Sequence, residues 1–249
     1  MLLENKVCIV TGAGKGFGRD IARTFYNQGA KLALITRSQA DVDDMVAEFN
    51  DKKSRILYFC GDVSNKKDVN NFISKAANNF GTFDILVNNA GMRFRKEFLD
   101  INSDELDLLL SVNLKSVFFM CQEVLPYMIK NNSGKIINMS SIAGTQGFKN
   151  LSGYVLTKAG IIGLTKSLAV EFAEKNIQIN ALAPGFCKTS YFENFKEKKD
   201  LYEFTLSRTP MGRWGESKEI AEVCLFLASS MSNYITGEVL KVDGGWSAG

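Results

Sequence analysis

The sequence predicts an α/β protein with one doubly wound sheet of seven mostly parallel strands and helices on both faces. Short apolar segments alternate with longer amphipathic ones from residue 6 onward, which is the pattern of strand-helix-strand units. A chain of 249 residues with 3 prolines and no Gly/Ser-rich linker predicts a single domain, residues 1–249. The expected strands are residues 6–11, 31–36, 55–60, 83–88, 135–140, 177–182 and 238–243.

The composition is that of an ordinary globular protein, with 45% hydrophobic and 23% charged residues. The 30 basic and 27 acidic residues are spread along the chain and leave a formal charge of +3. Neither a nucleic-acid partner nor an anionic membrane is therefore expected. The N-terminus lacks a basic segment followed by a long apolar stretch, and no apolar run approaches membrane-spanning length, so neither a signal peptide nor a membrane span is expected.

The cysteines and histidines restrict the chemistry. The 5 scattered cysteines form no CxxC pair, and most fall in apolar segments, which predicts buried, reduced thiols and a cytoplasmic protein. The chain has no histidine, which excludes a Ser-His-Asp hydrolase and histidine-ligated metal sites, so no metal is expected. Any proton transfer would then fall to tyrosine, lysine or a carboxylate.

A glycine-rich turn follows the first strand and precedes a helical pattern that runs to about Gln28. In such a turn, backbone N–H groups and the helix N-terminus can face a pyrophosphate, which predicts dinucleotide binding. The spacing departs from GxGxxG because Phe17 stands at the place of the third glycine. The residues expected to bind the cofactor here are Gly12, Gly14, Lys15, Gly16, Phe17 and Gly18.

The end of the second strand indicates which dinucleotide is bound. NAD-selective sites place an acid there to hold the ribose hydroxyls, but residues 31–40 contain none. Arg37 and Ser38 follow Thr36 at this point, and a guanidinium with hydroxyls suits a 2′-phosphate, to which Lys15 would add a second cation. We expect NADP, with NAD still possible.

Ser141, Tyr154 and Lys158 are candidates for catalysis. Residues four apart share one face of a helix, so the Tyr154 phenol and the Lys158 ammonium could meet over one ligand. A free tyrosine has a pKa of about 10, and a nearby ammonium should lower it toward neutrality. Ser141, just after the strand 135–140, could hydrogen-bond the same substrate oxygen. Taken alone, a buried tyrosine and a surface lysine at accidental spacing would look the same.

Together these patterns resemble the short-chain dehydrogenase/reductase family, over nearly the whole chain. The resemblance implies a Rossmann-like fold, a nicotinamide cofactor, and hydride transfer between that cofactor and a ketone or secondary alcohol. The matching motifs are Thr11 to Gly18 (TGxxxGxG), Asn88 to Gly91 (NNAG), Ser141 with Tyr154-x-x-x-Lys158, and Pro184-Gly185 with Thr189 (PGxxxT).

The resemblance also implies roles for further residues. Asp62 and Val63 would contact the adenine ring. Asn113 would hold a water that links Lys158 to solvent and would complete a catalytic tetrad. The residues expected against the rest of the cofactor are Asn89, Ala90, Gly91, Tyr154, Lys158, Pro184, Gly185 and Thr189.

Two further features concern assembly and substrate access. The helix that begins near Tyr154 has apolar and small residues nearly all the way round up to Phe172, which predicts burial on more than one side. In the family the equivalent helix packs against its copy in another subunit, which implies a homotetramer. Residues 190–210 mix aromatic and charged residues, and they correspond to the family's mobile lid over the substrate.

The substrate class stays open. The segment PMGRWG and the later ITG look like those of 3-oxoacyl-(acyl-carrier-protein) reductases, which favours a 3-oxoacyl thioester. The loop after NNAG carries Arg93, Arg95 and Lys96, and looks more like sugar-acid dehydrogenases, so a keto-sugar acid or a polyol is the alternative. These cations could meet a substrate carboxylate or simply be solvated. A non-catalytic NADP-binding sensor on the same fold is the third hypothesis.

Overall fold

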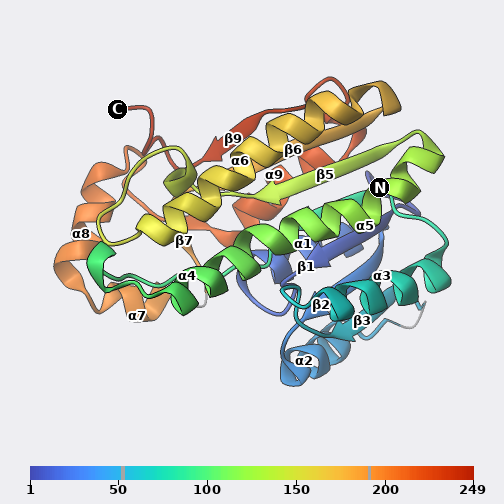
Figure 1. The fold of residues 1–249 in the computed structure, drawn as a ribbon, viewed down its shortest axis with the longest axis horizontal. Coiled ribbons are helices and arrows are strands. Elements are labelled where there is room, and N and C mark those ends of the chain that lie inside the picture. Colours follow the sequence, from blue (N-terminus) through green and yellow to red (C-terminus); the bar gives the residue numbers. More distant parts are fainter. Residues whose placement is uncertain (52–53, 190–191) are drawn as a thin grey trace.

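A computed structural model describes residues 1–51, 54–189 and 192–249. Within these residues the main sheet has seven strands, all parallel, in the order β3-β2-β1-β4-β5-β6-β9 (Figure 1). The predicted fold class and all seven strands are confirmed. The strand order reverses at β1: the chain first runs outward from β1 to β3, then returns to place β4 on the other side of β1. Open parallel sheets bind ligands at such a point, here between β1 and β4. The strands of this sheet are β1 Val7–Thr11, β2 Lys31–Thr36, β3 Ile56–Cys60, β4 Ile85–Asn88, β5 Gly134–Met139, β6 Ile177–Pro184 and β9 Val239–Val242.

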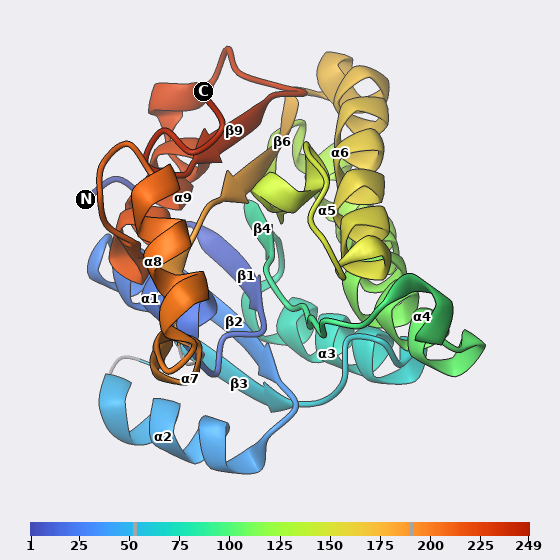
Figure 2. The same ribbon diagram turned by 90° about the vertical axis from the view of Figure 1, so that its left-hand side faces the viewer.

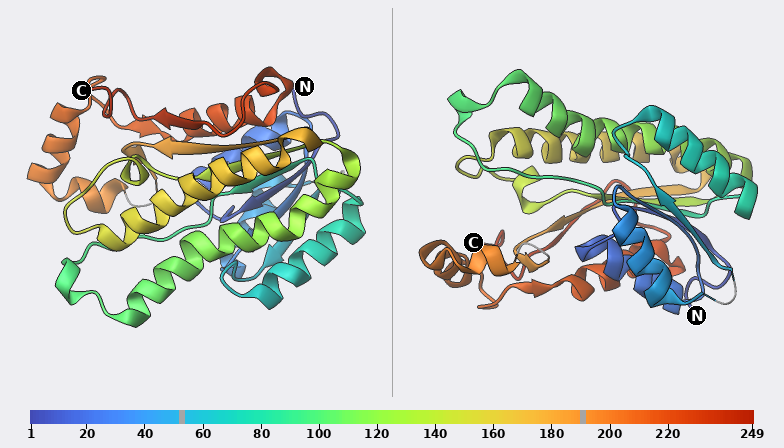
Figure 3. Two further views of the ribbon diagram at one scale, coloured as in Figure 1. Left: turned by 45° about the horizontal axis from the view of Figure 1, so that its top comes forward. Right: turned by 90° about the horizontal axis from the view of Figure 1, so that it is seen from below.

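Helices cover both faces of the sheet (Figures 2 and 3). One face carries α1, α2 and α9, and the other carries α3, α5 and α6. The helices are α1 Gly16–Asn27, α2 Gln39–Phe49, α3 Lys66–Phe80, α4 Ser103–Leu110, α5 Ser116–Asn131, α6 Ser152–Phe172, α7 Phe192–Lys196, α8 Lys199–Arg208 and α9 Ser217–Ala228.

The strands contribute side chains to two cores, because successive side chains of a strand point to opposite faces of the sheet. In β1, Cys8 and Val10 pack with α1 and α9, whereas Val7 and Ile9 pack with α3 and α5. Because both faces of such a strand are buried, apolar side chains are favoured at successive positions. The strands of this sheet are therefore continuous apolar runs in the sequence.

The segment Ser103–Asn131 is one continuous helical stretch with a local change of winding. Helix α4 passes into a π-helical turn, Ser111–Lys115, and α5 continues from it. By length and composition this stretch is apolar enough to cross a membrane, so the expectation that no such run exists was wrong. Half of its most apolar window is buried, and α5 packs on the sheet as the core helix of a globular protein does.

Helices α7 and α8 lie beyond the carboxyl ends of the strands (Figure 2). At their base is a short parallel pair, β7 Cys187–Lys188 with β8 Gly215–Glu216. The two helices make up most of the predicted lid, 190–210, of which residues 190 and 191 lie outside the described residues. Helices α7 and α8 thus lie at the same end of the sheet as the turns that follow the parallel strands.

Candidate active site

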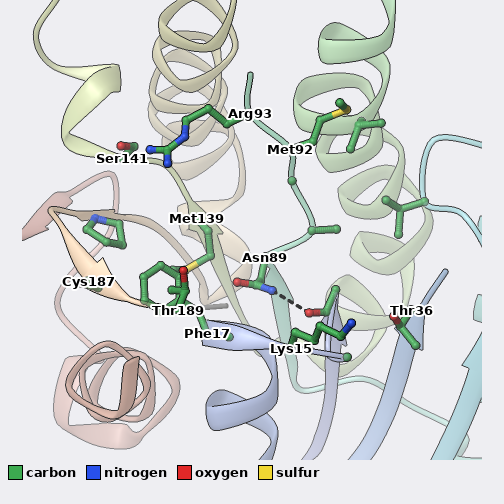
Figure 4. Close-up of a pocket in the computed structure, with 18 of the residues that line it drawn as sticks. Lys15, Phe17, Thr36, Asn89, Met92, Arg93, Met139, Ser141, Cys187 and Thr189 are labelled. Atoms are coloured by element: carbon green, nitrogen blue, oxygen red, sulfur yellow. Dashed lines mark hydrogen bonds between the residues drawn. The ribbon is translucent and has the colours of Figure 1, made fainter. Parts of the chain in front are cut away.

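A cleft of about 570 Å³ runs along the carboxyl ends of the strands (Figure 4). Its wall is formed by residues that follow β1 to β6, which is the place expected for a ligand of an open parallel sheet. Every predicted catalytic residue except Asn113 lies on this wall. So does every predicted cofactor residue except Gly18.

The turn after β1 is held against the turn after β4. Gly12 has a φ of +63°, and a Cβ there would lie 2.8 Å from the Ala90 Cα, so only glycine permits this approach. Thr11 Oγ1 accepts the backbone N–H of Asn89 at 2.9 Å and that of Ala90 at 3.0 Å. The Asn89 side-chain amide donates to the Thr11 and Gly12 carbonyl oxygens. The result is a narrow backbone cradle of the kind that a pyrophosphate occupies, so a dinucleotide fits these residues.

Gly18 requires a correction among the predicted cofactor residues. It lies off the cleft wall, and a Cβ at this position would overlap the Gly12 carbonyl oxygen. Glycine here lets helix α1 pack closely against its own preceding turn. Gly18 therefore supports the cradle from behind and does not form part of its ligand-facing surface.

The end of β2 carries cations together with an acid that the sequence analysis missed. Arg37 and Ser38 line the cleft, and the Arg37 side chain is 64% exposed, with its guanidinium 4.0 Å from Asp62. Lys15 lies 3.3 Å from the carboxylate of Asp41. Asp41 lies one residue beyond the acid-free stretch 31–40, and the first turn of α2 brings it back to the cleft wall. The charges here are therefore mixed.

The turns after β3 and β6 also reach the cleft. A Cβ at Gly185 would lie 2.7 Å from the Asp243 Cα, so glycine lets the turn after β6 pass close to the end of β9. Thr189 faces the first turn, where a Cβ at Gly16 would lie 3.5 Å from the Thr189 Cβ. The predicted residues in these two turns that line the cleft are Asp62, Val63, Pro184, Gly185 and Thr189.

Ser141, Tyr154 and Lys158 meet on the wall beside β5. Ser141 follows β5, and α6 carries Tyr154 and Lys158 one turn apart. The Lys158 ammonium lies 5.7 Å from the centre of the Tyr154 ring and donates to the Met139 carbonyl oxygen at 2.7 Å. Ser141 acts on the Tyr154 phenol, whose pKa it lowers, and both side chains line the cleft. A serine and a tyrosine hydroxyl thus face the same cleft.

The titration of these groups differs from the expectation. Burial raises the pKa of Tyr154 above its ordinary value, and the charge of Arg93 and the hydrogen bond with Ser141 offset this only in part. Burial lowers the pKa of Lys158 to about 8. The predicted lowering of the phenol pKa by Lys158 was therefore wrong, because desolvation has the largest effect on Tyr154 and Lys158, whose amine is bound to the Met139 carbonyl, is not among the groups that lower this pKa.

Asn113 is buried next to the cleft, in the π-helical turn. Its Oδ1 accepts the Met92 N–H at 2.8 Å, and its Nδ2 donates to the Met92 carbonyl at 2.9 Å and to Thr157 Oγ1 at 3.1 Å. Gly91 lies between Asn113 and Lys158, since a Cβ there would be 3.4 Å from the Asn113 Oδ1 and 3.6 Å from the Lys158 Nζ. Asn113 fixes the segment that carries Met92, and the water link to Lys158 stays a prediction.

Comparison with known proteins decides the family. The family model described as enoyl-(acyl carrier protein) reductase matches residues 12–247. This chain belongs to the short-chain dehydrogenase/reductase family. The resemblance inferred from the motifs is thereby confirmed, and the residues that carry those motifs lie together in one cleft.

Individual relatives of this short-chain dehydrogenase/reductase match along its whole length. It is 39% identical to the 3-oxoacyl-(acyl-carrier-protein) reductase FabG of Thermotoga maritima, over 98% of this chain and 99% of that one. It is 36% identical to the (2S)-((R)-hydroxy(phenyl)methyl)succinyl-CoA dehydrogenase subunit BbsD of Thauera aromatica, over 99% and 98% of the two chains. A gluconate 5-dehydrogenase from Burkholderia cenocepacia J2315, solved in complex with NADP and tartrate, superposes with a TM-score of 0.93 at 32% identity, covering 99% of this chain and 97% of the other.

The cleft of this short-chain dehydrogenase/reductase also has an aromatic wall that the sequence analysis did not single out. We use this name for Phe186, Phe192, Phe195 and Trp214, which line the cleft together. The Trp214 ring centre lies 5.3 Å from that of Phe186, 5.2 Å from Phe192 and 4.8 Å from Phe195. Trp214 is buried, and its Nε1 donates to Thr205 Oγ1 at 2.8 Å. The abundance of aromatics in residues 190–209 was the available signal, but it could not show which rings converge.

The three cations after NNAG have different environments. Lys96 forms an ion pair with Glu105 at 2.7 Å, and Arg95 donates to a backbone carbonyl oxygen at 3.3 Å. Arg93 lines the cleft and forms no ion pair with any described residue. Figure 4 shows its side chain pointing toward Ser141. Of the three candidates for binding an anion, the geometry selects Arg93.

Proposed function

We propose that this enzyme reduces the ketone of a 3-oxoacyl thioester with NADP(H), or oxidises the corresponding alcohol in the reverse direction. The observation that supports this most directly is the convergence of Ser141, Tyr154 and Lys158 on the wall of a cleft shaped for a dinucleotide. A bound nicotinamide supplies the hydride in reduction and accepts it in oxidation. The protein has to bind the substrate carbonyl, exclude water and move one proton.

Tyr154 and Ser141 handle the substrate oxygen. In reduction the Tyr154 hydroxyl donates its proton to that oxygen, while the Ser141 hydroxyl donates a hydrogen bond that stabilises the developing negative charge. Burial keeps the pKa of Tyr154 raised, so the phenol is protonated at neutral pH, as a proton donor must be. Lys158, which donates to the Met139 carbonyl, would bind the ribose hydroxyls of the cofactor and replenish the proton of Tyr154.

The preference for NADP(H) rests on Arg37 and Ser38. The Ser38 oxygen accepts the Asp41 N–H at 3.2 Å as a helix cap, which leaves the hydroxyl hydrogen available to a phosphate. Arg37 is mostly exposed and only loosely associated with Asp62, so its guanidinium is available for a 2′-phosphate. Asp41 acts against this preference by pairing with Lys15. We therefore propose NADP(H) as the preferred cofactor and NAD(H) as a weaker one.

The thioester substrate is supported by the relatives. The Thermotoga maritima and Thauera aromatica proteins are both named for acyl substrates carried on a thiol carrier. A second candidate, a keto-sugar acid, is favoured by Arg93, which lines the cleft without an ion pair to any residue that the structure describes and so suits a carboxylate. The relative from Burkholderia cenocepacia is named a gluconate 5-dehydrogenase.

The test is NADPH and NADH oxidation with acetoacetyl thioesters beside 5-keto-gluconate. Turnover of the thioester with a higher kcat/KM for NADPH supports the proposal, and turnover of only the sugar acid replaces it with the second candidate. Tight NADPH binding without turnover of any carbonyl compound would indicate a sensor and would contradict catalysis.

We also propose that the enzyme is a cytoplasmic homotetramer. Exposed apolar side chains lie on the outer surfaces of α5 and α6, with Phe118 49%, Leu156 53% and Val170 82% exposed in the single chain. Exposed apolar surface of this kind marks an interface between proteins. Sedimentation equilibrium should give four times the chain mass of 27.6 kDa, and a monomer would contradict the proposal.

A further inference from the structure

The cleft that Ser141 and Tyr154 line also presents two unlike surfaces. One is the guanidinium of Arg93, and the other is the aromatic wall. We propose that the preferred substrate carries, besides its ketone, an anionic group bound by Arg93 and an apolar ring packed on the aromatic wall. This inference rests on the proposed function and narrows its substrate class.

Arg93 is held close to the reacting groups. The two hydrogen bonds between Asn113 and the Met92 backbone fix the residue directly before it. The positive charge of Arg93 acts on the phenol of Tyr154 and lowers its pKa. The guanidinium of Arg93 can affect the phenol strongly only where little water surrounds the two groups. When a substrate excludes water from the cleft, an unpaired guanidinium loses hydration, and a negative group on the substrate would compensate for that loss.

The neighbouring cations show that this placement is specific. Arg95 is only two residues away, yet it donates to a backbone carbonyl and does not line the cleft. Lys96 is neutralised by Glu105, which is bound through both carboxylate oxygens at 2.7 Å. One cation of the loop is thus left for a ligand, and it is the one that points toward Ser141 (Figure 4).

The aromatic wall is a fixed apolar surface. Its rings come from the turn after β6, from α7, and from the segment before β8. A second layer supports it, because Trp246 lies 4.9 Å from Phe186 and stacks with Phe148 at 6.1 Å. The rings pack against one another tilted or edge to face, and such rings offer apolar contact to another ring but no hydrogen bonds to the hydroxyl groups of a sugar chain. The wall therefore disfavours a polyol and favours an aryl or alicyclic group.

The two surfaces together distinguish the candidate substrates. A plain acetoacetyl thioester would use neither surface, and a keto-sugar acid would use only Arg93. A ring-bearing 3-oxoacyl thioester with a carboxylate on its side chain would use both. The enzyme should therefore discriminate among the four combinations of ring and charge.

The experiment compares four N-acetylcysteamine thioesters with NADPH as reductant. They are acetoacetyl and 3-oxo-3-phenylpropanoyl thioesters, each without and with a carboxymethyl group at C2. We expect the highest kcat/KM for the compound that has both the ring and the carboxylate, and a loss of about tenfold for each group removed, the size of one good contact. Equal kcat/KM for all four compounds would overturn the inference while leaving the proposed function intact.

Variants assign each preference to its surface. Arg93→Met should raise the KM of the two carboxylates about 10- to 100-fold, as expected for a lost charged hydrogen bond, and leave the KM of the two neutral compounds unchanged. Arg93→Lys should restore part of the difference, and Arg95→Met is the matched control that should not move it. Phe195→Leu should lower kcat/KM about 3- to 10-fold for the ring-bearing compounds alone, with Phe98→Leu, at an exposed position off the cleft wall, as its control.

The contrary outcomes are separable. An equal rise in KM for all four compounds in Arg93→Met would refute anion binding and leave Arg93 only its effect on the pKa of Tyr154. NADPH binding, followed by fluorescence, checks that each variant is folded. NADPH binding without turnover of any of the four thioesters would refute the proposed function and the inference with it.

Discussion

The cofactor end and the substrate end of the cleft are built in different ways. At the cofactor end, backbone turns are packed so closely that a Cβ at Gly12 or Gly185 would meet the backbone of a neighbouring turn. At the substrate end, long side chains such as Arg93 and Trp214 form the surface. Backbone turns suit groups that every dinucleotide shares, namely phosphate and ribose. Side chains can vary without disturbing those turns, so they set substrate specificity.

Tyr154 and Lys158 lie at the junction of the two ends, and both are buried enough to have shifted pKa values. The difference between the ends can therefore be tested by changing one residue at a time. A change at the junction should abolish turnover, and a change at the cofactor end should alter only the affinity for the cofactor. A change at the substrate end should alter substrate affinity or the pH dependence of turnover.

The largest effect is expected for Tyr154→Phe. Removing the hydroxyl removes the proposed proton donor, and general acid catalysis contributes about 100- to 10,000-fold. We expect kcat to fall by that factor while the Kd for NADPH is unchanged, as measured by steady-state kinetics and fluorescence titration. Tyr234→Phe is a matched control, because Tyr234 is fully exposed. Turnover of Tyr154→Phe close to that of the unaltered enzyme would show that the phenol is not the proton donor.

Lys158→Met should abolish most activity and stabilise the free protein. Burial lowers the pKa of Lys158 from 10.5 to about 8, so the folded state binds fewer protons than the unfolded state between these values. The destabilisation is then full below pH 8 and fades as pH rises toward 10.5. Allowing for the lost bond to the Met139 carbonyl, we expect a gain of about 2 kcal/mol at pH 7, shrinking by pH 10. Urea unfolding at both pH values measures it, and a gain that does not change with pH would contradict the explanation.

The sequence allowed much of the cofactor end to be predicted, because its motifs are local. Each glycine turn follows a strand, and so does NNAG. The first amide of NNAG ties β4 to β5, since Asn88 donates to Asn138 at 2.9 Å. Gly18 shows the limit of such motifs, since a position can be required for packing without touching the ligand.

The substrate end could not be predicted in the same way, because it depends on tertiary packing. Phe186 and Trp214 are far apart in sequence, and only the chain path through α7 and α8 brings their rings within 5.3 Å. Asp41 was not predicted for a simpler reason: it lies in the first turn of α2, which places it near the end of β2. The direction of the Tyr154 pKa shift was predicted wrongly because the four-residue spacing places Tyr154 and Lys158 on one face of a helix but says nothing about how far each is buried from water.

A smaller effect is expected for the charges at the cofactor end. Arg37→Leu removes the guanidinium proposed to bind the 2′-phosphate and should raise the KM for NADPH about tenfold, with little change for NADH. Asp41→Asn frees Lys15 and should lower the KM for NADPH by a few-fold, the scale of an exposed ion pair. Asp43→Asn, on the same helix and bonded to Gln39, is the control. Equal changes for NADPH and NADH in Arg37→Leu would remove the argument for NADP.

The smallest effect is a displacement of the pH profile by Arg93→Gln. The charge of Arg93 lowers the pKa of Tyr154, so its removal should raise that pKa further. Reduction needs the protonated phenol, and its rate is lost as pH rises through this pKa, so the alkaline limb should move to higher pH. Oxidation needs the phenolate, so its acid limb should move in the same direction and the oxidation rate at neutral pH should fall. Arg95→Gln should leave both limbs in place, because Arg95 is not among the groups that shift Tyr154. Opposite displacements of the two limbs could not come from one phenol, and would assign the proton to a different group.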